Sequence, residues 1–234
     1  MSIYVVTGAS RGLGLEFVKQ LSAKDNTVFA CARNPDQAEE LKKLVDNKKV
    51  YSIKLDTTNE QSLKSAVDEI SKHAPNGIDV LINNAGISLS WKSIKETNKD
   101  ELMKTFETNV AGVVETTNTF LPLLRKRGKD HTKKVVNISS LLGSIGGLDM
   151  QEGAAYRISK AALNMVTKLQ SLQLAEENFI VYSAHPGWVQ TDLGGSNAPI
   201  TPDVSIKGML SKIESATSKD NGGFFDYTGK PIVW

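Results

Sequence analysis

The 234-residue chain has little of several residue types, and each shortage excludes a class of protein. It contains a single cysteine, Cys31, so no disulfide can form within the chain and a disulfide-stapled scaffold is excluded. No apolar stretch approaches the length of a membrane span. Basic residues are dispersed and the formal net charge is only +2, which gives little electrostatic reason to expect nucleic acid or a membrane as partner.

The remaining composition is that of an ordinary soluble globular protein, with 40% hydrophobic and 23% charged residues. A strand-like segment begins at Ile3, which leaves no room for a signal peptide, and Cys31 lies in an apolar run typical of a buried strand. We therefore expect a reducing, cytoplasmic location.

Short β-branched and apolar runs alternate with longer segments of helical period, which indicates a parallel sheet with helices on both faces. The predicted strands are Ile3–Thr7, Thr27–Ala32, Val50–Leu55, Val80–Asn83, Lys134–Ser139, Phe179–Ala184 and a short one near Phe224 and Phe225. The predicted helices are Gly12–Lys24, Pro35–Asp46, Glu60–His73, Asp100–Arg127, Ala154–Glu177 and Asp203–Ser215. Two of these helices have local start signals: Asn34 before Pro35, and Asn59, are predicted N-caps. No repeat or linker divides the chain, so we predict one α/β domain over residues 1–234, a doubly wound (Rossmann) fold with a seven-stranded parallel sheet.

A glycine-rich segment, VVTGASRGLG, joins the first predicted strand to the first predicted helix. A pyrophosphate must approach the N–H groups at a helix N-terminus, and side chains at the glycine positions would block it. A tight turn without a ligand is the alternative, but the position between strand and helix is the context that a dinucleotide loop requires. The Lys-Ser/Thr of a nucleoside triphosphatase loop is missing. The predicted cofactor contacts in this loop are Gly8, Ser10, Arg11, Gly12, Leu13 and Gly14.

The end of the second predicted strand selects the dinucleotide. An acid there would bind the ribose 2'-hydroxyl of NAD and repel a 2'-phosphate. The chain has Arg33 at this point, and Arg11 can approach from the loop; each alone is equally well a solvated surface charge. Two arginines without an acid favour NADP(H), and Asp36, after Pro35, is interpreted as a helix-start residue.

Two further strand ends carry candidate cofactor contacts. Asp56 follows the third strand, where a carboxylate can accept the adenine amine or simply cap the strand end. Asn83, Ala85 and Gly86 follow the fourth strand and combine small residues beside the expected cofactor with amides that can hold neighbouring strands. A plain Asn-Gly turn explains the glycine but not the doubled asparagine at positions 83 and 84.

Tyr156 and Lys160 lie four residues apart in a predicted helix, so they project from one face and can act together. Such a pair alone is weak evidence, because two surface residues of an amphipathic helix match it equally well. Here it follows a strand that ends at Ser139 and Ser140, and that strand follows a nucleotide loop. Together these features predict an active site.

These motifs, in this order, resemble the short-chain dehydrogenase/reductase family over nearly the whole chain. The motifs are the three loop glycines, the Asn83–Gly86 run, Ile138-Ser139-Ser140, Tyr156-x-x-x-Lys160 and Pro186-Gly187. The last residues, Gly222–Trp234, further resemble the Sniffer-type carbonyl reductases, including fungal ketoreductase relatives.

The resemblance implies four catalytic roles. Tyr156 would donate a proton to a carbonyl, Lys160 would activate it, Ser140 would donate a hydrogen bond to the substrate oxygen, and Asn109 would hold a proton-relay water. Tyr156 and Lys160 would also contact the cofactor.

Ser140 is preferred over Ser139 because the family serine lies three residues before a glycine, here Gly143. The spacing from Ser140 to Tyr156 is longer than in most family members. We therefore expect the extra segment, Ser144–Gly153, to form a loop beside the substrate.

The turn after the sixth strand resembles the family's nicotinamide-binding turn. Its expected contacts are Pro186, Gly187, Val189 and Thr191, with the last two at the carboxamide, and a substrate lid is expected over about residues 191–215. We expect no metal, because His185 has no second ligand at a plausible spacing.

Hydride transfer to a ketone builds negative charge on oxygen, so the reaction needs a positioned acid. An unperturbed tyrosine has a pKa of about 10, and a neighbouring ammonium is expected to lower it. The sequence thus predicts an NADPH-dependent carbonyl reductase acting on a hydrophobic ketone or aldehyde. Apolar residues that could line its pocket, or equally pack in a core or lid, are Trp91, Leu141, Leu142, Ile145, Met150, Trp188 and Leu193.

Two other functions fit the fold: a non-catalytic NADP(H)-responsive regulatory protein, and an alcohol dehydrogenase working in the oxidative direction. The complete catalytic set disfavours the first, and the arginines disfavour the second. The two long predicted helices have apolar faces that could build a homodimer or homotetramer, although both must also pack on the sheet. The sequence leaves the substrate and stereochemistry open.

Overall fold

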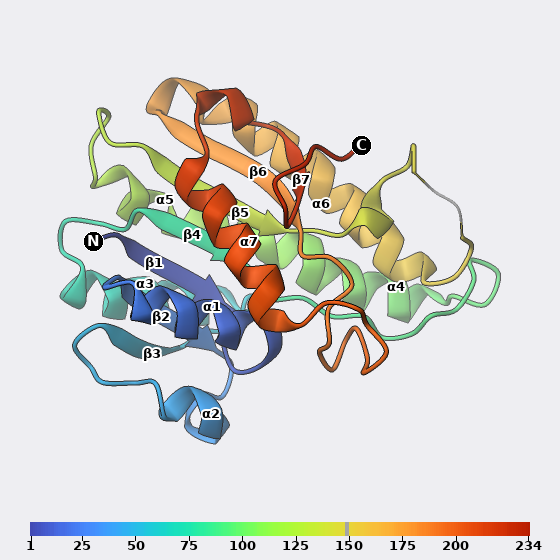
Figure 1. Cartoon of the computed structure of the whole chain (residues 1–234), viewed down its shortest axis with the longest axis horizontal. Helices are drawn as coiled ribbons and strands as arrows, with labels where there is room; N and C mark the ends of the chain where they lie inside the picture. Colours follow the sequence, from blue (N-terminus) through green and yellow to red (C-terminus); the bar gives the residue numbers. More distant parts are fainter. Residues whose placement is uncertain (148–149) are drawn as a thin grey trace.

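The computed structural model describes residues 1–147 and 150–234, whose strands form one parallel seven-stranded sheet of order β3-β2-β1-β4-β5-β6-β7 (Figure 1). The strands are β1 (Ile3–Thr7), β2 (Thr27–Ala32), β3 (Val50–Lys54), β4 (Val80–Asn83), β5 (Lys133–Ile138), β6 (Phe179–His185) and β7 (Phe224–Asp226). Each predicted strand is present, and the single-domain doubly wound fold is confirmed. Because the strand order reverses between β1 and β4, a binding crevice is expected at the carboxyl ends of these strands.

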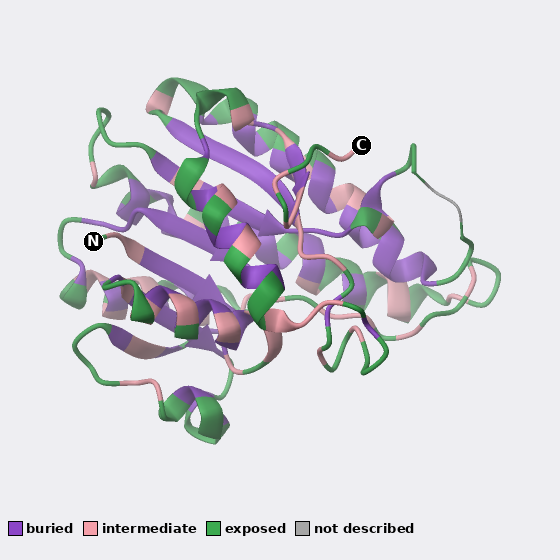
Figure 2. Cartoon of the chain, in the orientation of Figure 1, coloured by how far each residue is buried: buried purple, intermediate pink, exposed green. Residues whose placement is uncertain are grey.

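Helices cover both faces of the sheet (Figure 1). They are α1 (Gly12–Ala23), α2 (Glu39–Lys42), α3 (Glu60–His73), α4 (Lys99–Phe106), α5 (Gly112–Arg125), α6 (Ala154–Gln173) and α7 (Pro202–Ser215). Helices α1 and α7 pack on one face, and α3 and α5 pack on the other, so the sheet separates two apolar clusters. Side chains alternate between them: Val28 and Ala30 face the α1 side, whereas Phe29 and Cys31 face the α3 side. Figure 2 shows the buried strands between helices whose exposed residues face outward.

One predicted helix is wrong. The segment Pro35–Asp46 contains only a 3₁₀ turn over Pro35–Gln37 and the single-turn helix α2. Asn34 makes no side-chain cap hydrogen bond, so the predicted start signal is not used. Asp46 instead accepts hydrogen bonds from three backbone N–H groups that follow it, which turns the chain toward β3.

The long helix predicted over Asp100–Arg127 has an interruption. A π-helical segment, Glu107–Ala111, separates α4 from α5 and contains the fully buried Asn109. π-helical turns inside α-helices occur frequently at functional sites. The interruption thus falls on the predicted fourth catalytic residue, which a helical period in the sequence does not reveal.

Apolar side chains remain exposed on the outer face of α6, and those of Ile158, Met165, Leu169 and Leu172 are the largest among them. Self-association through the two long predicted helices stays a prediction. Among the described residues, no helix combines the length and apolar character needed to cross a bilayer.

Asn59→Ala is expected to lower the free energy of unfolding by about 1 kcal/mol, because the Asn59 side chain accepts the Ser62 N–H at 2.8 Å as the N-cap of α3. Asn34→Ala is the matched control, since that side chain caps nothing, and its effect should lie near zero. Urea unfolding of both variants measures the difference; equal losses would contradict the assignment.

Candidate active site

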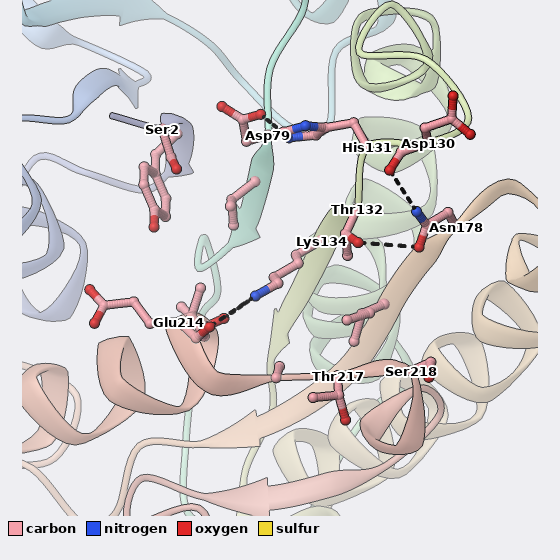
Figure 3. A pocket seen from close by; sticks show the side chains of 15 residues that line it. Ser2, Asp79, Asp130, His131, Thr132, Lys134, Asn178, Glu214, Thr217 and Ser218 are labelled. Atoms are coloured by element: carbon pink, nitrogen blue, oxygen red, sulfur yellow. Dashed lines mark hydrogen bonds and ion pairs between the residues drawn. The ribbon is translucent and has the colours of Figure 1, made fainter.

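The predicted cofactor loops follow the carboxyl ends of the parallel strands, which lie at one edge of the sheet (Figure 1). Lys160 of α6 and Asn109 contact the same edge, at Ile138, the last residue of β5, and at Ile87 after β4 respectively, so the predicted site residues share it. A hollow of about 720 Å³ lies at the opposite, amino edge and contains none of them. Figure 3 shows its polar lining, where Asp79 lies beside His131 and Lys134 points to the end of α7 at Glu214. The Asp79 carboxylate already pairs with Arg127 and His131, each at 2.6 Å, so we interpret this edge as structural.

The loop after β1 has room for backbone only. A Cβ at Gly14 would lie 2.2 Å from the Gly8 carbonyl oxygen, and a Cβ at Gly8 would lie 2.9 Å from Cα of Ala85. Gly8 also has a φ of +66°, which favours glycine. No side chain caps the start of α1, which leaves its first N–H groups to bind an anion. The predicted loop fits a pyrophosphate.

Two residues that the sequence analysis did not select hold this loop in place. The Asn84 amide donates to the carbonyl oxygens of Thr7 at 2.8 Å and Gly8 at 3.2 Å. The Thr7 hydroxyl oxygen accepts from the N–H groups of Asn84 and Ala85, each at 3.0 Å. The doubled asparagine at positions 83 and 84 indicated an amide with a special role, but the sequence alone did not show which of the two amides holds the phosphate loop.

The Asn83 side chain points into the core instead of toward the loop. It donates to Asn137 at 2.8 Å and Thr117 at 3.0 Å, and Asn137 donates in turn to Thr167 and Gln170 on α6. This buried network connects β4 and β5 to α5 and α6. It supports the predicted role of an amide that holds neighbouring strands.

The two arginines have different surroundings. Arg33 is exposed at the end of β2. Arg11 pairs with Asp192, with 2.9 Å between Nη1 and Oδ2, in the turn that follows β6. A Cβ at Gly12 would lie 3.5 Å from Thr191 Cγ2, so this turn lies directly against the phosphate loop.

Asp56 closes its own turn. Its carboxylate accepts from the N–H of Thr58 at 3.0 Å and from the Thr58 hydroxyl at 2.8 Å. This geometry matches the strand-end cap that was the alternative interpretation, and a contact with adenine stays a prediction.

The two serines after β5 are clearly distinguished. Ser139 donates to Asn164 Oδ1 at 2.7 Å and is fully engaged with α6. The Ser140 hydroxyl oxygen accepts the Leu142 N–H at 3.1 Å, and its side chain lies close enough to Tyr156 to favour the phenolate. The structure therefore places the serine predicted from its distance to Gly143 beside the predicted acid.

Lys160 lies behind Tyr156, with Nζ 5.5 Å from the centre of the phenol ring, and it donates to the Ile138 carbonyl oxygen at 2.7 Å. Gly143 allows this arrangement, because a Cβ there would lie 2.6 Å from the Lys160 carbonyl carbon. The loop after Ser140 and helix α6 can thus approach each other only at a glycine.

Burial controls the charges of this pair. It raises the pKa of Tyr156 to about 12, and the nearby Ser140 side chain opposes part of that rise. Burial also lowers the pKa of Lys160 to about 8. The expectation that the tyrosine pKa lies below its usual value is therefore wrong for the chain alone, because desolvation of the phenolate is the largest cause of the shift and Lys160 is not among the groups that lower it.

Asn109 is anchored on both sides. Its amide donates to the Ile87 carbonyl oxygen at 2.8 Å and the Ser159 hydroxyl at 3.0 Å, and its oxygen accepts the Ile87 N–H at 2.8 Å. A Cβ at Gly86 would lie 3.3 Å from this oxygen and 3.7 Å from Lys160 Nζ. Asn109 therefore lies in the same cluster as Lys160 and is held there by Ile87 and Ser159, and its contact with a relay water stays a prediction.

The turn after β6 is tightly held. The Pro186 carbonyl oxygen accepts from Ser205 of α7 at 2.6 Å, Val189 bridges to Ile200, and Gly187 has a φ of +84°. Of the expected lid, helix α7 packs its apolar residues into the core beside α1. The preceding loop, residues 191–201, is not helical and contacts the phosphate loop through the Arg11–Asp192 ion pair. Motion of this segment stays a prediction.

His185 is the last residue of β6 and is half-buried, and desolvation lowers its pKa to about 4. It is therefore neutral at physiological pH and is suited to packing at the strand end.

Six of the seven apolar candidates for the pocket are exposed, so ordinary core packing does not explain them. They are Trp91, Leu141, Ile145, Met150, Trp188 and Leu193. Within the expected substrate loop, Ser144 donates to the Val233 carbonyl oxygen at 2.6 Å, and Gly146 donates its N–H to that of Trp234 at 3.0 Å. Residues 148 and 149 of this loop lie outside the described residues.

The chain belongs to the short-chain dehydrogenase family, whose model, described as short chain dehydrogenase, matches residues 2–199. It is 38% identical to an uncharacterized oxidoreductase of Schizosaccharomyces pombe, over 98% of this chain and 96% of that one. It is therefore an oxidoreductase of this family.

Two solved structures are similar over the full chain. The carbonyl reductase Sniffer of D. melanogaster is 35% identical, with a TM-score of 0.96 and complete coverage of both chains. The NADPH-bound carbonyl reductase from chicken fatty liver is 35% identical, with a TM-score of 0.95, and the match covers 100% of this chain and 99% of that one.

Lys160→Met is expected to stabilise the protein at pH 7 relative to the wild type, because the native state must hold a buried ammonium whose pKa is lowered from 10.5 to about 8. Wild-type stability should rise from pH 8 to 10.5, where the unfolded chain binds the extra proton, so the advantage of the variant should shrink by up to roughly 3 kcal/mol. Denaturant unfolding at both pH values measures this; a pH-independent difference would contradict a buried charged lysine.

Proposed function

We propose that the protein is an NADPH-dependent carbonyl reductase that converts ketones or aldehydes to alcohols. The observation that carries the proposal is the placement of Ser140 beside Tyr156, with Lys160 behind the phenol, next to a loop suited to a pyrophosphate. The similarity to two carbonyl reductases, one of them bound to NADPH, supports it.

The chain's own residues would bind the cofactor at three points. The loop glycines and the start of α1 hold the pyrophosphate, and Arg11 and Arg33 hold the 2'-phosphate. The turn with Pro186, Val189 and Thr191 holds the nicotinamide amide group. When bound, the reduced nicotinamide supplies the hydride.

Tyr156 and Ser140 would donate hydrogen bonds to the substrate carbonyl oxygen and so fix its position. As hydride adds to the carbonyl carbon, the Tyr156 proton moves to the oxygen, which completes the alcohol. The phenolate that remains is stabilised by the Lys160 ammonium, which is charged below a pH of about 8. Because the pKa of Tyr156 is about 12, the group keeps its proton at neutral pH and is available as an acid.

The regulatory and oxidative alternatives make different predictions in one assay. A regulatory protein would bind NADPH, seen as a change in nucleotide fluorescence, without oxidising it in the presence of aromatic aldehydes, α-diketones or keto esters. An alcohol dehydrogenase would reduce NADP⁺ with the corresponding alcohols faster than it oxidises NADPH. The proposed function requires NADPH consumption that depends on the carbonyl compound, with NADH as the weaker donor.

Tyr156→Phe should lower kcat by at least 10²-fold, the usual range for loss of a general acid, while NADPH binding stays near normal. The phenylalanine keeps the ring beside Lys160 and removes only the hydroxyl that donates the proton. Steady-state turnover and nucleotide fluorescence titration measure the two effects. Near-normal turnover would contradict the assignment of Tyr156 as the general acid.

The serine pair provides the matched control for this site. Ser140→Ala removes the hydroxyl beside Tyr156 that would donate to the substrate oxygen, and should lower kcat by roughly 10-fold or more. Ser139→Ala removes a bond to Asn164 and should lower stability with turnover largely kept. Equal kinetic losses in the two variants would contradict the separate roles.

Arg33→Asp should reverse the cofactor preference, because a carboxylate at the end of β2 repels a 2'-phosphate and accepts a ribose hydroxyl. We expect kcat/KM to fall at least 10-fold for NADPH and to rise for NADH. Asp192→Asn is the companion variant: it frees Arg11 from its ion pair and should tighten NADPH by a few-fold at most, since exposed pairs contribute about 1 kcal/mol or less. Unchanged NADPH affinity in Arg33→Asp would exclude Arg33 from the cofactor site.

A further inference from the structure

A tryptophan outside the predicted catalytic set lies against the catalytic tyrosine. Trp91 belongs to the segment that connects β4 to α4, and its ring centre is 6.1 Å from that of Tyr156, with 55° between the ring planes. Tyr156 is only 9% exposed, whereas Trp91 is 49% exposed. One side of the indole therefore covers the phenol, and much of its surface remains accessible to a molecule that approaches the Tyr156 hydroxyl.

The start of α6 fixes the other side of the indole. Gly153, the N-cap of α6, has a φ of +74°, and a Cβ there would lie 2.6 Å from Trp91 Cε3 and 2.7 Å from Cζ3. The Ala154 N–H donates to the Lys92 carbonyl oxygen at 3.1 Å. The six-membered ring of Trp91 thus contacts the backbone of Gly153, which lies three residues before Tyr156 in the chain.

The two neighbours of Trp91 are anchored to one carboxylate. Ser90 donates a hydrogen bond to Glu101 of α4, and Lys92 forms an ion pair with Glu101 at 3.6 Å. The Glu101 side chain is only 9% exposed, so this pairing is partly shielded from solvent. Because residues on both sides of Trp91 are held by the same group, the indole has a fixed direction relative to Tyr156.

We propose that Trp91, seated on Gly153, determines substrate specificity by forming an aromatic wall that favours carbonyl compounds with a flat ring next to the carbonyl group. This inference rests on the proposed function. When the carbonyl oxygen of a substrate accepts hydrogen bonds from Tyr156 and Ser140, one of the two substituents on the carbonyl carbon lies beside the indole. Aromatic rings attract each other at centre distances of about 4.5–7 Å, an interaction that a saturated ring of similar size does not make.

The test compares benzaldehyde with cyclohexanecarbaldehyde, which differ in the flatness and aromaticity of the ring but little in size. The wild type should have the lower KM for benzaldehyde. Trp91→Leu should raise that KM roughly 2- to 10-fold with kcat nearly unchanged, and should change the KM for cyclohexanecarbaldehyde much less. Trp91→Phe keeps a ring and should restore most of the preference.

Gly153→Ala tests the role of Trp91 independently, because the added Cβ would displace the indole from its position on Gly153. It should reproduce the KM change of Trp91→Leu, and in the Trp91→Ala background, where no indole is present, it should add little for benzaldehyde. Thermal unfolding of each variant, and its turnover of cyclohexanecarbaldehyde, verify that the catalytic centre is intact.

The possible failures are distinguishable. If Trp91→Leu changes the KM of both aldehydes equally, or changes neither, the specificity role of Trp91 is wrong, whereas the proposed carbonyl reductase function is unaffected. Full additivity of Gly153→Ala with Trp91→Ala would also overturn the specificity role. If the wild type consumes NADPH with neither aldehyde nor any other carbonyl compound, the proposed function is wrong, and so is the specificity role of Trp91 that rests on it.

Discussion

The close approach of helix α6 to the end of β5 is the constraint on which the site depends. Gly143 touches the Lys160 backbone, and the Lys160 ammonium donates to the Ile138 carbonyl oxygen at 2.7 Å. Ser139 and Asn164 form a second bond across the same contact. Any side chain at position 143 would push the helix away, and Ser140 and Tyr156 would no longer meet. A backbone contact between a loop and a helix therefore sets the distance between the Ser140 and Tyr156 hydroxyls, the two groups proposed to contact the substrate oxygen.

Burying this pair has an electrostatic consequence. The same desolvation that raises the pKa of Tyr156 lowers that of Lys160, so each group on its own favours its neutral form. The cost is offset where the pair is used, because charge that develops on a substrate oxygen or on the phenol meets a nearby cation in surroundings that contain little water. Polar groups buried without a direct structural need are typical of functional sites, and here they lie at the end of the sheet where the strand order reverses.

The sequence predicts much of this arrangement because the relevant signals are local. The period of apolar residues predicts all seven strands, and the distance from Ser140 to Gly143 selects the serine that the structure places beside Tyr156. Local signals fail where competing contacts decide the outcome. Asn34 and Pro35 indicate a helix start, yet the turn around Asp46 leaves only a short helix there. The signals at Asn83 and Asn84 are identical, and only the three-dimensional contacts send one amide into the core and the other to the phosphate loop.

The sequence by itself determined the family, the order of the strands along the chain and the residue types of the site, because glycine spacing and helical period are properties of neighbouring positions. The tertiary structure alone decided what depends on distant segments. It placed Asp192 against Arg11, seated Trp91 on Gly153, and reversed the expected shift of the Tyr156 pKa. The physical reason is that desolvation and close packing arise from all the surrounding atoms, and these come together only when the sheet brings remote parts of the chain to one edge.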